Sequence, residues 1–168
     1  LFTSLIVFLL SLYLLYLFDP LSTNYQFQTQ INWITQFNIQ YHIGIDGISL
    51  PLILLTTFIT PLVIMTSKTS PKKDLHQYLA SFLILESLMI GVFSSLDAFL
   101  FYIFWEAMLI PMFIIIGVWG GKNRIYATIK FFLYTFLGSV FMLLALIYLH
   151  LKTGSYAIND FYNANLSL

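Results

Sequence analysis

The chain has 168 residues, of which 60% are hydrophobic and 8% charged, and its formal net charge is zero. An average soluble domain is about 45–50% apolar and about 25% charged, so this composition excludes a cytosolic enzyme and a disordered segment. A neutral chain has no positive field to attract nucleic acid, and a chain without cysteine has no disulfide, iron–sulfur cluster or thiolate metal site. We therefore expect an all-α, polytopic integral membrane protein.

Five apolar stretches predict transmembrane helices, each of which needs about 20 mostly apolar residues. They are expected at residues 1–18, 48–66, 78–94, 97–119 and 126–151. The first stretch does not fit a secretory signal, because neither a basic region before it nor a small-residue cleavage site after it is present. Since residue 1 is Leu rather than Met, either processing removed the start or the sequence is a piece of a longer protein.

Between the first two stretches, apolar and polar residues alternate. The alternation covers Tyr25 to Trp33 and then Gln36 to Asp46. Period two over two adjacent runs predicts an amphipathic β-hairpin over about residues 25–46, with its turn near Ile34 and Thr35. An isolated hairpin is marginal in water. Its apolar face is therefore expected to rest either on the ends of the helices or on a neighbouring subunit.

Basic residues orient the helices. Three lysines lie between residues 68 and 73, after the second stretch, and Lys122 and Arg124 follow the fourth. Alternating topology puts both loops on one side, whereas the other side carries Lys152. By the positive-inside rule, the two basic loops should face the matrix or cytoplasm and residues 19–47 the opposite side.

Two acidic residues, Glu86 and Glu106, fall within the third and fourth stretches. Each lies about ten residues from the short turn at residues 95–96, which places both about 15 Å below that membrane face. A carboxylate at this depth costs about 3 kcal/mol on insertion scales, so such residues usually face protein or water and serve function. We expect Glu106 to be a functional residue and Glu86 to be a further candidate. The alternative for each is a neutral acid that is hydrogen-bonded for packing.

Pro111 and Lys130 are the other candidate residues of the site. Pro111 has no N–H for the carbonyl of Ala107, which kinks the helix and either offers a seat for water beside Glu106 or serves packing alone. Lys130 is expected about 8 Å deep and Glu106 about 20 Å deep from the same face. Lys130 is thus too shallow to pair with Glu106 directly, and it either extends its side chain to the interface or serves the proton path.

The three histidines, His42, His76 and His150, are scattered over different segments and lack metal-ligand spacing. The sequence also lacks a glycine-rich phosphate loop, a nucleophile elbow and a catalytic triad. We therefore predict no metal-binding and no cofactor-binding residue in this chain.

Four long segments resemble a known family. They are YHIGIDGISLPLILLTTF (41–58), LILESLMIGVF (83–93), LDAFLFYIFWEAMLIPMFIIIGVWG (96–120) and KFFLYTFLGSVFMLLA (130–145). In these segments the chain is similar to the N-terminal part of the subunit 4 family of mitochondrial NADH:ubiquinone oxidoreductase, respiratory complex I. The resemblance implies that residues 1–168 are part of an antiporter-like proton-translocation domain. It also implies that Glu106, the glutamate of the F-W-E-x-x-L-x-P-M helix, is the family's essential buried acid.

The resemblance further implies what surrounds the chain. Flavin, iron–sulfur clusters and quinone would belong to other subunits of the complex. The expected partners are lipid, other membrane-arm subunits including neighbouring antiporter-like ones, and whichever chain carries the C-terminal part with its lysines and discontinuous helices. The expected location is the mitochondrial inner membrane, with a bacterial plasma membrane as the alternative. A subunit of a multi-subunit cation/proton antiporter is the alternative function, because its large subunits share the motif, and a purely structural membrane scaffold is a third.

Overall fold

The computed structural model describes residues 1–67 and 74–162 of the chain. Its helices are α1 (Phe2–Leu17), α2 (Ser49–Ser67), α3 (Leu75–Ser94), α4 (Ala98–Trp119), α5 (Arg124–Thr153) and the short α6 (Ile158–Tyr162). Its strands are β1 (Gln26–Ile34) and β2 (Ile39–Ile45), joined by the 3₁₀ turn η1 (Thr35–Phe37). The expected fold class, a mostly helical polytopic protein with one β-hairpin, is confirmed.

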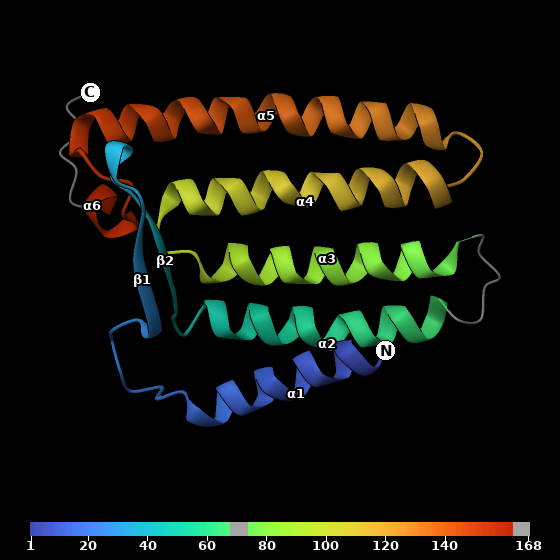
Figure 1. The fold of residues 1–168 in the computed structure, drawn as a ribbon, viewed down its shortest axis with the longest axis horizontal. Helices are drawn as coiled ribbons and strands as arrows, with labels where there is room; N and C mark the ends of the chain where they lie inside the picture. The colour runs from blue at the N-terminus through green and yellow to red at the C-terminus, as the bar shows by residue number, and fades with distance from the viewer. Residues whose placement is uncertain (68–73, 163–168) are drawn as a thin grey trace.

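The five long helices lie in one row, in chain order (Figure 1). Neighbouring helices in the row pack on each other: α1 on α2, α2 on α3, α3 on α4 and α4 on α5. Successive helices are antiparallel, so the end of α2 and the start of α3 lie at the same end of the row as the α4–α5 turn. The hairpin lies across the opposite end (Figure 1).

Four of these helices, α2 to α5, are long and apolar enough to cross a membrane, by length and composition. Helix α1 has 16 residues and is therefore about 24 Å long, shorter than the roughly 30 Å hydrocarbon core of a bilayer. The described part of α2 contains no ionisable side chain, and that of α4 contains only Tyr102 and Glu106. Helices that are apolar around their whole circumference belong in a protein core or a membrane.

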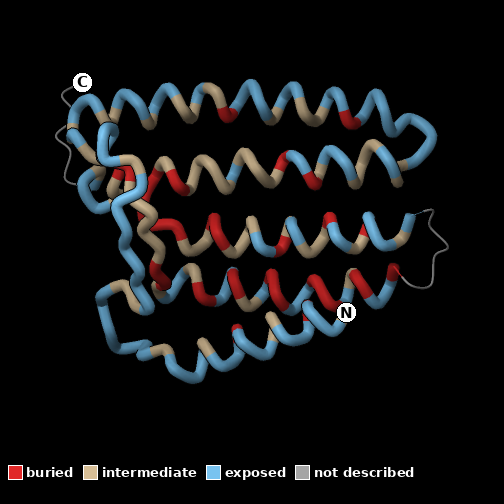
Figure 2. Tube along the Cα trace, viewed as in Figure 1, coloured by how far each residue is buried: buried red, intermediate tan, exposed pale blue. Residues whose placement is uncertain are grey.

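Burial is uneven along the row (Figure 2). Helix α2 carries more buried positions than any other helix of the described row, whereas α1 and α5 at the two ends of the row are largely exposed. The apolar core lies where the hairpin meets α2, and it is formed by Ile45, Leu50 and Ile53. Much of the apolar surface of the row is thus left for lipid or for other protein.

The β-hairpin rests on the turn between α3 and α4. Strand β2 is the inner strand: Ile39 at its start is 4% exposed, and the carbonyl of His42 accepts a 2.9 Å hydrogen bond from the backbone N–H of Leu96 in that turn. Strand β1 is the outer strand, with Ile31 58% and Trp33 50% exposed. Of the two expected supports, the ends of the helices are therefore the one used within this chain.

The hairpin turn lies a few residues later than expected. The turn was expected near Ile34 and Thr35, but β1 continues to Ile34, and the chain then forms η1 and reverses direction at Asn38, whose φ is 52°. Asparagine tolerates this left-handed conformation better than most residues. The pairing is also irregular near Phe27, which has a φ of 53° and is 42% exposed. Phe27 is therefore only partly covered: its side chain lines a cavity together with Leu10 of α1 and Ile43 of β2.

Asp97 joins three elements at this end of the molecule. It is 2% exposed, and its Oδ1 accepts hydrogen bonds from the backbone N–H groups of Phe99 (2.9 Å) and Leu100 (3.0 Å), which caps α4. Its Oδ2 accepts a 3.3 Å bond from the N–H of Gln40 in β2. The segment after α5 packs here as well, because the N–H of Ala98 donates to the carbonyl of Tyr156 at 2.8 Å.

Candidate functional site

Glu106 lies in the middle of α4 and is half-buried. Its Oε1 atom is buried and has no hydrogen-bond partner among the described residues. Tyr102, one helical turn earlier, lies on the same face of the helix, and its hydroxyl interacts both with the Glu106 carboxyl and with the hydroxyl of Ser139 on α5. Glu106 thus belongs to a polar group that bridges α4 and α5.

The hydrogen bonds of this group are set by Ser139. Its side chain is 3% exposed, and its hydroxyl donates a 2.8 Å bond to the carbonyl of Phe136 in its own helix. A hydroxyl group has one proton and two lone pairs, so the Ser139 oxygen is left as an acceptor. Tyr102 is therefore the donor in this group, with Ser139 on one side and Glu106 on the other.

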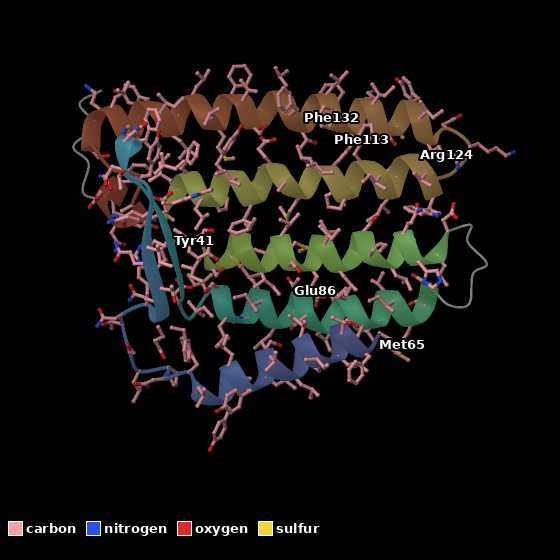
Figure 3. The ribbon with its side chains drawn as sticks, in the orientation of Figure 1. Tyr41, Met65, Glu86, Phe113, Arg124 and Phe132 are labelled. Atoms are coloured by element: carbon pink, nitrogen blue, oxygen red, sulfur yellow. The ribbon has the colours of Figure 1, made fainter. Side chains whose placement is uncertain are left out.

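Glu86 lies in α3 and points toward α2, away from α4 (Figure 3). It is 3% exposed, and its Oε1 atom, like that of Glu106, is buried without a hydrogen-bond partner among the described residues. Its carboxyl interacts with the hydroxyl of Thr60 on α2. A cavity of about 220 Å³ lies between the two helices and is lined by Glu86 from α3 and by Thr56 and Thr60 from α2.

The structure does not bring the two acids together. Glu86 takes its polar neighbours from α2, whereas Glu106 takes them from α4 and α5. Between α3, α4 and α5 lies an apolar cavity of about 380 Å³, which is lined by Leu85 and Trp105 but by neither acid. The two carboxyls lie at similar sequence distances from the α3–α4 turn, but they face different helix pairs.

Pro111 is buried within α4, five residues after Glu106, and the helix continues on both sides of it. It supplies no N–H to the carbonyl of Ala107, which leaves an acceptor one residue from the acid. A second proline, Pro61, is buried in α2 next to Thr60 and was missed. It leaves the carbonyl of Thr57 without its helical donor in the same way.

Lys130 lies on the exposed side of α5. Its Nζ is 3.5 Å from the hydroxyl of Tyr126, and it lies 5.5 and 5.9 Å from the ring centroids of Tyr126 and Tyr134, one turn to either side. These are cation–π distances. Within the described part of the chain, Lys130 thus contacts two tyrosines and forms no ion pair with Glu106.

The histidines are separated in the fold. The Nε2 atom of His42 lies 3.2 Å from the side-chain oxygen of Gln28, and His150 stacks on Tyr156 with ring centroids 4.1 Å apart. Among residues 1–67 and 74–162, no group of three or more His, Cys, Asp or Glu side chains could hold a metal ion.

Several residues of the two polar groups were not singled out from the sequence. Tyr102 and Glu106 are four residues apart, a spacing that predicts contact on a helix, so Tyr102 was within reach of sequence reasoning. Thr56 and Thr60 have the same spacing and precede Pro61, which is also a readable signal. Ser139 and the capping role of Asp97 depend on contacts between elements that no local pattern specifies.

The fold and its two acids define the class of the protein: a polytopic α-helical membrane protein with carboxyl groups buried among apolar helices. Two family models together match nearly the whole chain. NADH-ubiquinone oxidoreductase chain 4, amino terminus, matches residues 1–95, and NADH:quinone oxidoreductase/Mrp antiporter, TM, matches residues 95–167. The chain belongs to the NADH-ubiquinone oxidoreductase chain 4 family.

Similar proteins are found in bacteria and in plants. The chain is 48% identical to NADH-quinone oxidoreductase subunit M of Rickettsia prowazekii (strain Madrid E) over 94% of its length and 32% of the relative. It is 49% identical to NADH-ubiquinone oxidoreductase chain 4 of Marchantia polymorpha over 91% of its length and 31% of the relative. The chain thus spans about a third of the length of these curated relatives.

Solved structures share the fold. A chain of respiratory complex I from Thermus thermophilus with bound NADH matches with a TM-score of 0.83 and 26% identity, over 98% of this chain and 34% of that one. A chain of the Mrp complex from Dietzia sp. DQ12-45-1b matches with a TM-score of 0.78 and 15% identity, over 94% and 17% of the two chains, and shows a common fold alone. The family resemblance expected from the four sequence segments is confirmed.

Proposed function

We propose that this chain is the N-terminal part of a proton-translocating membrane-arm subunit of respiratory complex I, in which electron transfer from NADH to ubiquinone drives proton pumping. Its enzymatic role is that of a subunit of NADH:ubiquinone reductase. The observation that carries this proposal is Glu106, a carboxyl within an apolar helix with a buried, unpartnered oxygen atom. Membership of the chain 4 family supports the assignment to complex I.

The neighbours of Glu106 suit a carboxyl that changes protonation. When Glu106 is ionised, the Tyr102 hydroxyl donates to it, since charge-assisted hydrogen bonds are the stronger ones. When Glu106 takes up a proton, Tyr102 can turn its own proton to the Ser139 oxygen, which remains an acceptor. Both protonation states thus keep the phenol hydrogen-bonded, so the switch leaves no buried donor unsatisfied.

The unpartnered Oε1 atom of Glu106 is the position at which a proton or a cationic side chain arrives. The carbonyl of Ala107, which Pro111 leaves without its helical donor, supplies an acceptor for a water molecule beside it. Lys130 does not serve as the direct partner of Glu106 here, because its side chain lies among Tyr126 and Tyr134.

In this proposal the redox chemistry is carried by other subunits, which would hold the flavin, the iron–sulfur clusters and the quinone. The partners are neighbouring membrane-arm subunits, including antiporter-like ones, the chain that carries the C-terminal part of the subunit, and lipid. The exposed apolar surface of α1 and α5 offers the area for such contacts. The location is the mitochondrial inner membrane or the plasma membrane of a bacterium, since relatives of both kinds are equally similar.

A subunit of a multi-subunit cation/proton antiporter is the second candidate. The family model that matches residues 95–167 spans both classes, and the Mrp complex shares the fold. Complex I is preferred because the higher identities are to its subunits. Purification of the native assembly separates the two: flavin and iron–sulfur subunits accompany the chain in complex I, and an assembly without them would favour the antiporter.

The test of the proposed function is Glu106→Gln, which keeps the size and hydrogen bonding of the side chain but removes the exchangeable proton. We expect the complex to assemble and coupled NADH oxidation and proton transport to fall at least tenfold. Glu106→Asp should retain part of the activity, because it still titrates. Activity is measured in membranes that contain equal amounts of assembled complex, and wild-type pumping by Glu106→Gln would leave Glu106 as a packing residue.

A further inference from the structure

The cavity between α2 and α3 contains a buried carboxyl that the proposed mechanism at Glu106 does not use. Glu86 is 3% exposed and points into this cavity of about 220 Å³ (Figure 3). Its polar neighbours there are Thr56 and Thr60, one helical turn apart on α2, and the other lining residues are apolar. The site is therefore small, mostly apolar and partly open at the surface of the helix row, with Glu86 on the α3 side and the two threonines on the α2 side.

The two threonines can accept hydrogen bonds from Glu86 but have no proton left to donate. The hydroxyl of Thr60 donates to the carbonyl of Thr56 at 2.9 Å, and the hydroxyl of Thr56 donates to the carbonyl of Leu52 at 2.8 Å. A hydroxyl has a single proton and two lone pairs, so each presents an acceptor to the cavity. An ionised carboxylate is itself only an acceptor, whereas a protonated one can donate to Thr60.

Among the residues that line the cavity, all of them described, Glu86 is the only one with an ionisable side chain. The described part of α2 has no ionisable side chain. In α4 the ionisable side chains are Tyr102 and Glu106, neither of which lines the cavity, and within α3 itself His76 and Tyr78 lie at least two turns before Glu86. An isolated carboxylate among apolar helices is strongly disfavoured, so the surroundings favour the neutral acid.

Water can reach the free oxygen of Glu86. A buried water molecule needs about two to four polar partners and room for one probe sphere. The Oε1 atom of Glu86 and the hydroxyl oxygens of Thr56 and Thr60 supply the partners, and the cavity supplies the room. Such a molecule can donate to these acceptors and accept the carboxyl proton.

We propose that Glu86, Thr56 and Thr60 form a second proton-binding site, separate from Glu106. In this site Glu86 is a neutral acid whose O–H group donates a hydrogen bond to the hydroxyl oxygen of Thr60. The proton exchanges with water in the α2–α3 cavity. The O–H bond of Glu86 breaks as a new O–H bond forms on the water molecule, which leaves a carboxylate and a hydronium ion. The reverse step restores the neutral acid. The site concerns a different helix pair from Glu106 and does not depend on the function proposed for that residue.

The experiment is infrared difference spectroscopy on the purified, assembled complex, with exchange from H₂O to D₂O. We expect the wild type to show a carbonyl band of a protonated carboxylic acid that shifts in D₂O, and Glu86→Gln to lose that band. Glu106→Gln should retain it. A Glu86→Gln spectrum that loses a carboxylate band instead, or that leaves the carbonyl region unchanged, would overturn the proposal.

Thr60→Val supplies a second test that keeps the carboxyl and the shape of the side chain. Without its acceptor, the Glu86 carbonyl band should move to higher frequency, and Ser87→Ala, an exposed hydroxyl on the next residue of α3, should leave the band in place. An unmoved band in Thr60→Val would contradict the assigned hydrogen bond. Because this readout is spectroscopic, it is independent of proton transport, so failure here and failure of the Glu106 experiment are distinguishable.

Discussion

At the scale of single residues, the hydroxyl groups near the two buried acids donate their hydrogen bonds to the backbone of their own helices. Ser139, Thr56 and Thr60 each give their proton to a carbonyl of their own helix. Serine and threonine commonly do this in helices. The consequence for function is that Thr56 and Thr60 present acceptors to the cavity beside Glu86. Ser139 presents an acceptor to Tyr102, whose hydroxyl also interacts with Glu106.

Tyr102→Phe should therefore impair the site while leaving the fold intact. Loss of a hydrogen bond to a charged group costs about 1.5–3 kcal/mol, so we expect proton transport to fall about tenfold or more and its pH profile to shift. The measurement is transport rate against pH in membranes with matched amounts of assembled complex. Tyr16→Phe, at an 84% exposed position on α1, serves as the control. Equal rates for the two variants would show that Tyr102 does not act on Glu106.

Sequence reasoning at this scale located the acids but not their surroundings. Glu86 and Glu106 were identified because a charge in an apolar stretch is costly wherever its side chain points. Which helix each one faces depends on the rotation of α3 and α4 about their axes, and helices that are apolar on all sides carry no stripe that reveals it. For that reason Tyr102 was predictable from its spacing, whereas Ser139 was not.

At the scale of elements, the hairpin is the part of the fold in which prediction and structure differ most. Period-two alternation correctly predicted two strands, although the burial of β2 itself does not alternate, because Gly44 and Ile45 are both buried. It did not predict that β1 would lie outside β2, since both strands show the same pattern. Alternation predicts that each strand has an apolar face. Which strand is covered within this chain depends on the packing of β2 on the α3–α4 turn.

Ile39→Asp tests this arrangement. Ile39 is 4% exposed, and a carboxylate there would be buried without a partner, which costs several kcal/mol. We expect the yield of assembled complex to fall to a small fraction of the wild-type yield, as measured on native gels. Ile31→Asp is the matched control, with the same change at a position that is 58% exposed, and it should be tolerated much better. Equal losses would contradict the assignment of β2 as the inner strand.

At the scale of the whole molecule, alternating helices place the hairpin and the α4–α5 loop at opposite ends of the row (Figure 1). The orientation inferred from the basic residues assigns the α4–α5 loop to the matrix or cytoplasm. The other basic loop, residues 68–73, lies outside the described residues. The opposite placement of the two ends follows from the fold, whereas their sides of the membrane stay a prediction.

Single-cysteine labelling checks the orientation, and the chain offers a clean background because it contains no cysteine. With Asn123→Cys and Gln28→Cys introduced separately, a membrane-impermeant thiol reagent should label the first only from the matrix or cytoplasmic side and the second only from the other. Both positions are exposed, so labelling does not depend on unfolding. Labelling of both from the same side would contradict the antiparallel row, and exchanged sides would contradict the orientation.

The arrangement of the helices in chain order has a consequence for biosynthesis. A helix that contacts only its predecessor and its successor finds half of its contacts already present when it leaves the ribosome, and contacts that are local in sequence form fast. The row from α1 to α5 can thus grow helix by helix during insertion. The exception is the end closed by Asp97, where β2 and the segment around Tyr156 meet the α3–α4 turn across long stretches of chain. That end closes last, after α5 has crossed the membrane, so translation beyond residue 156 is required before the start of α4 acquires all of its hydrogen bonds.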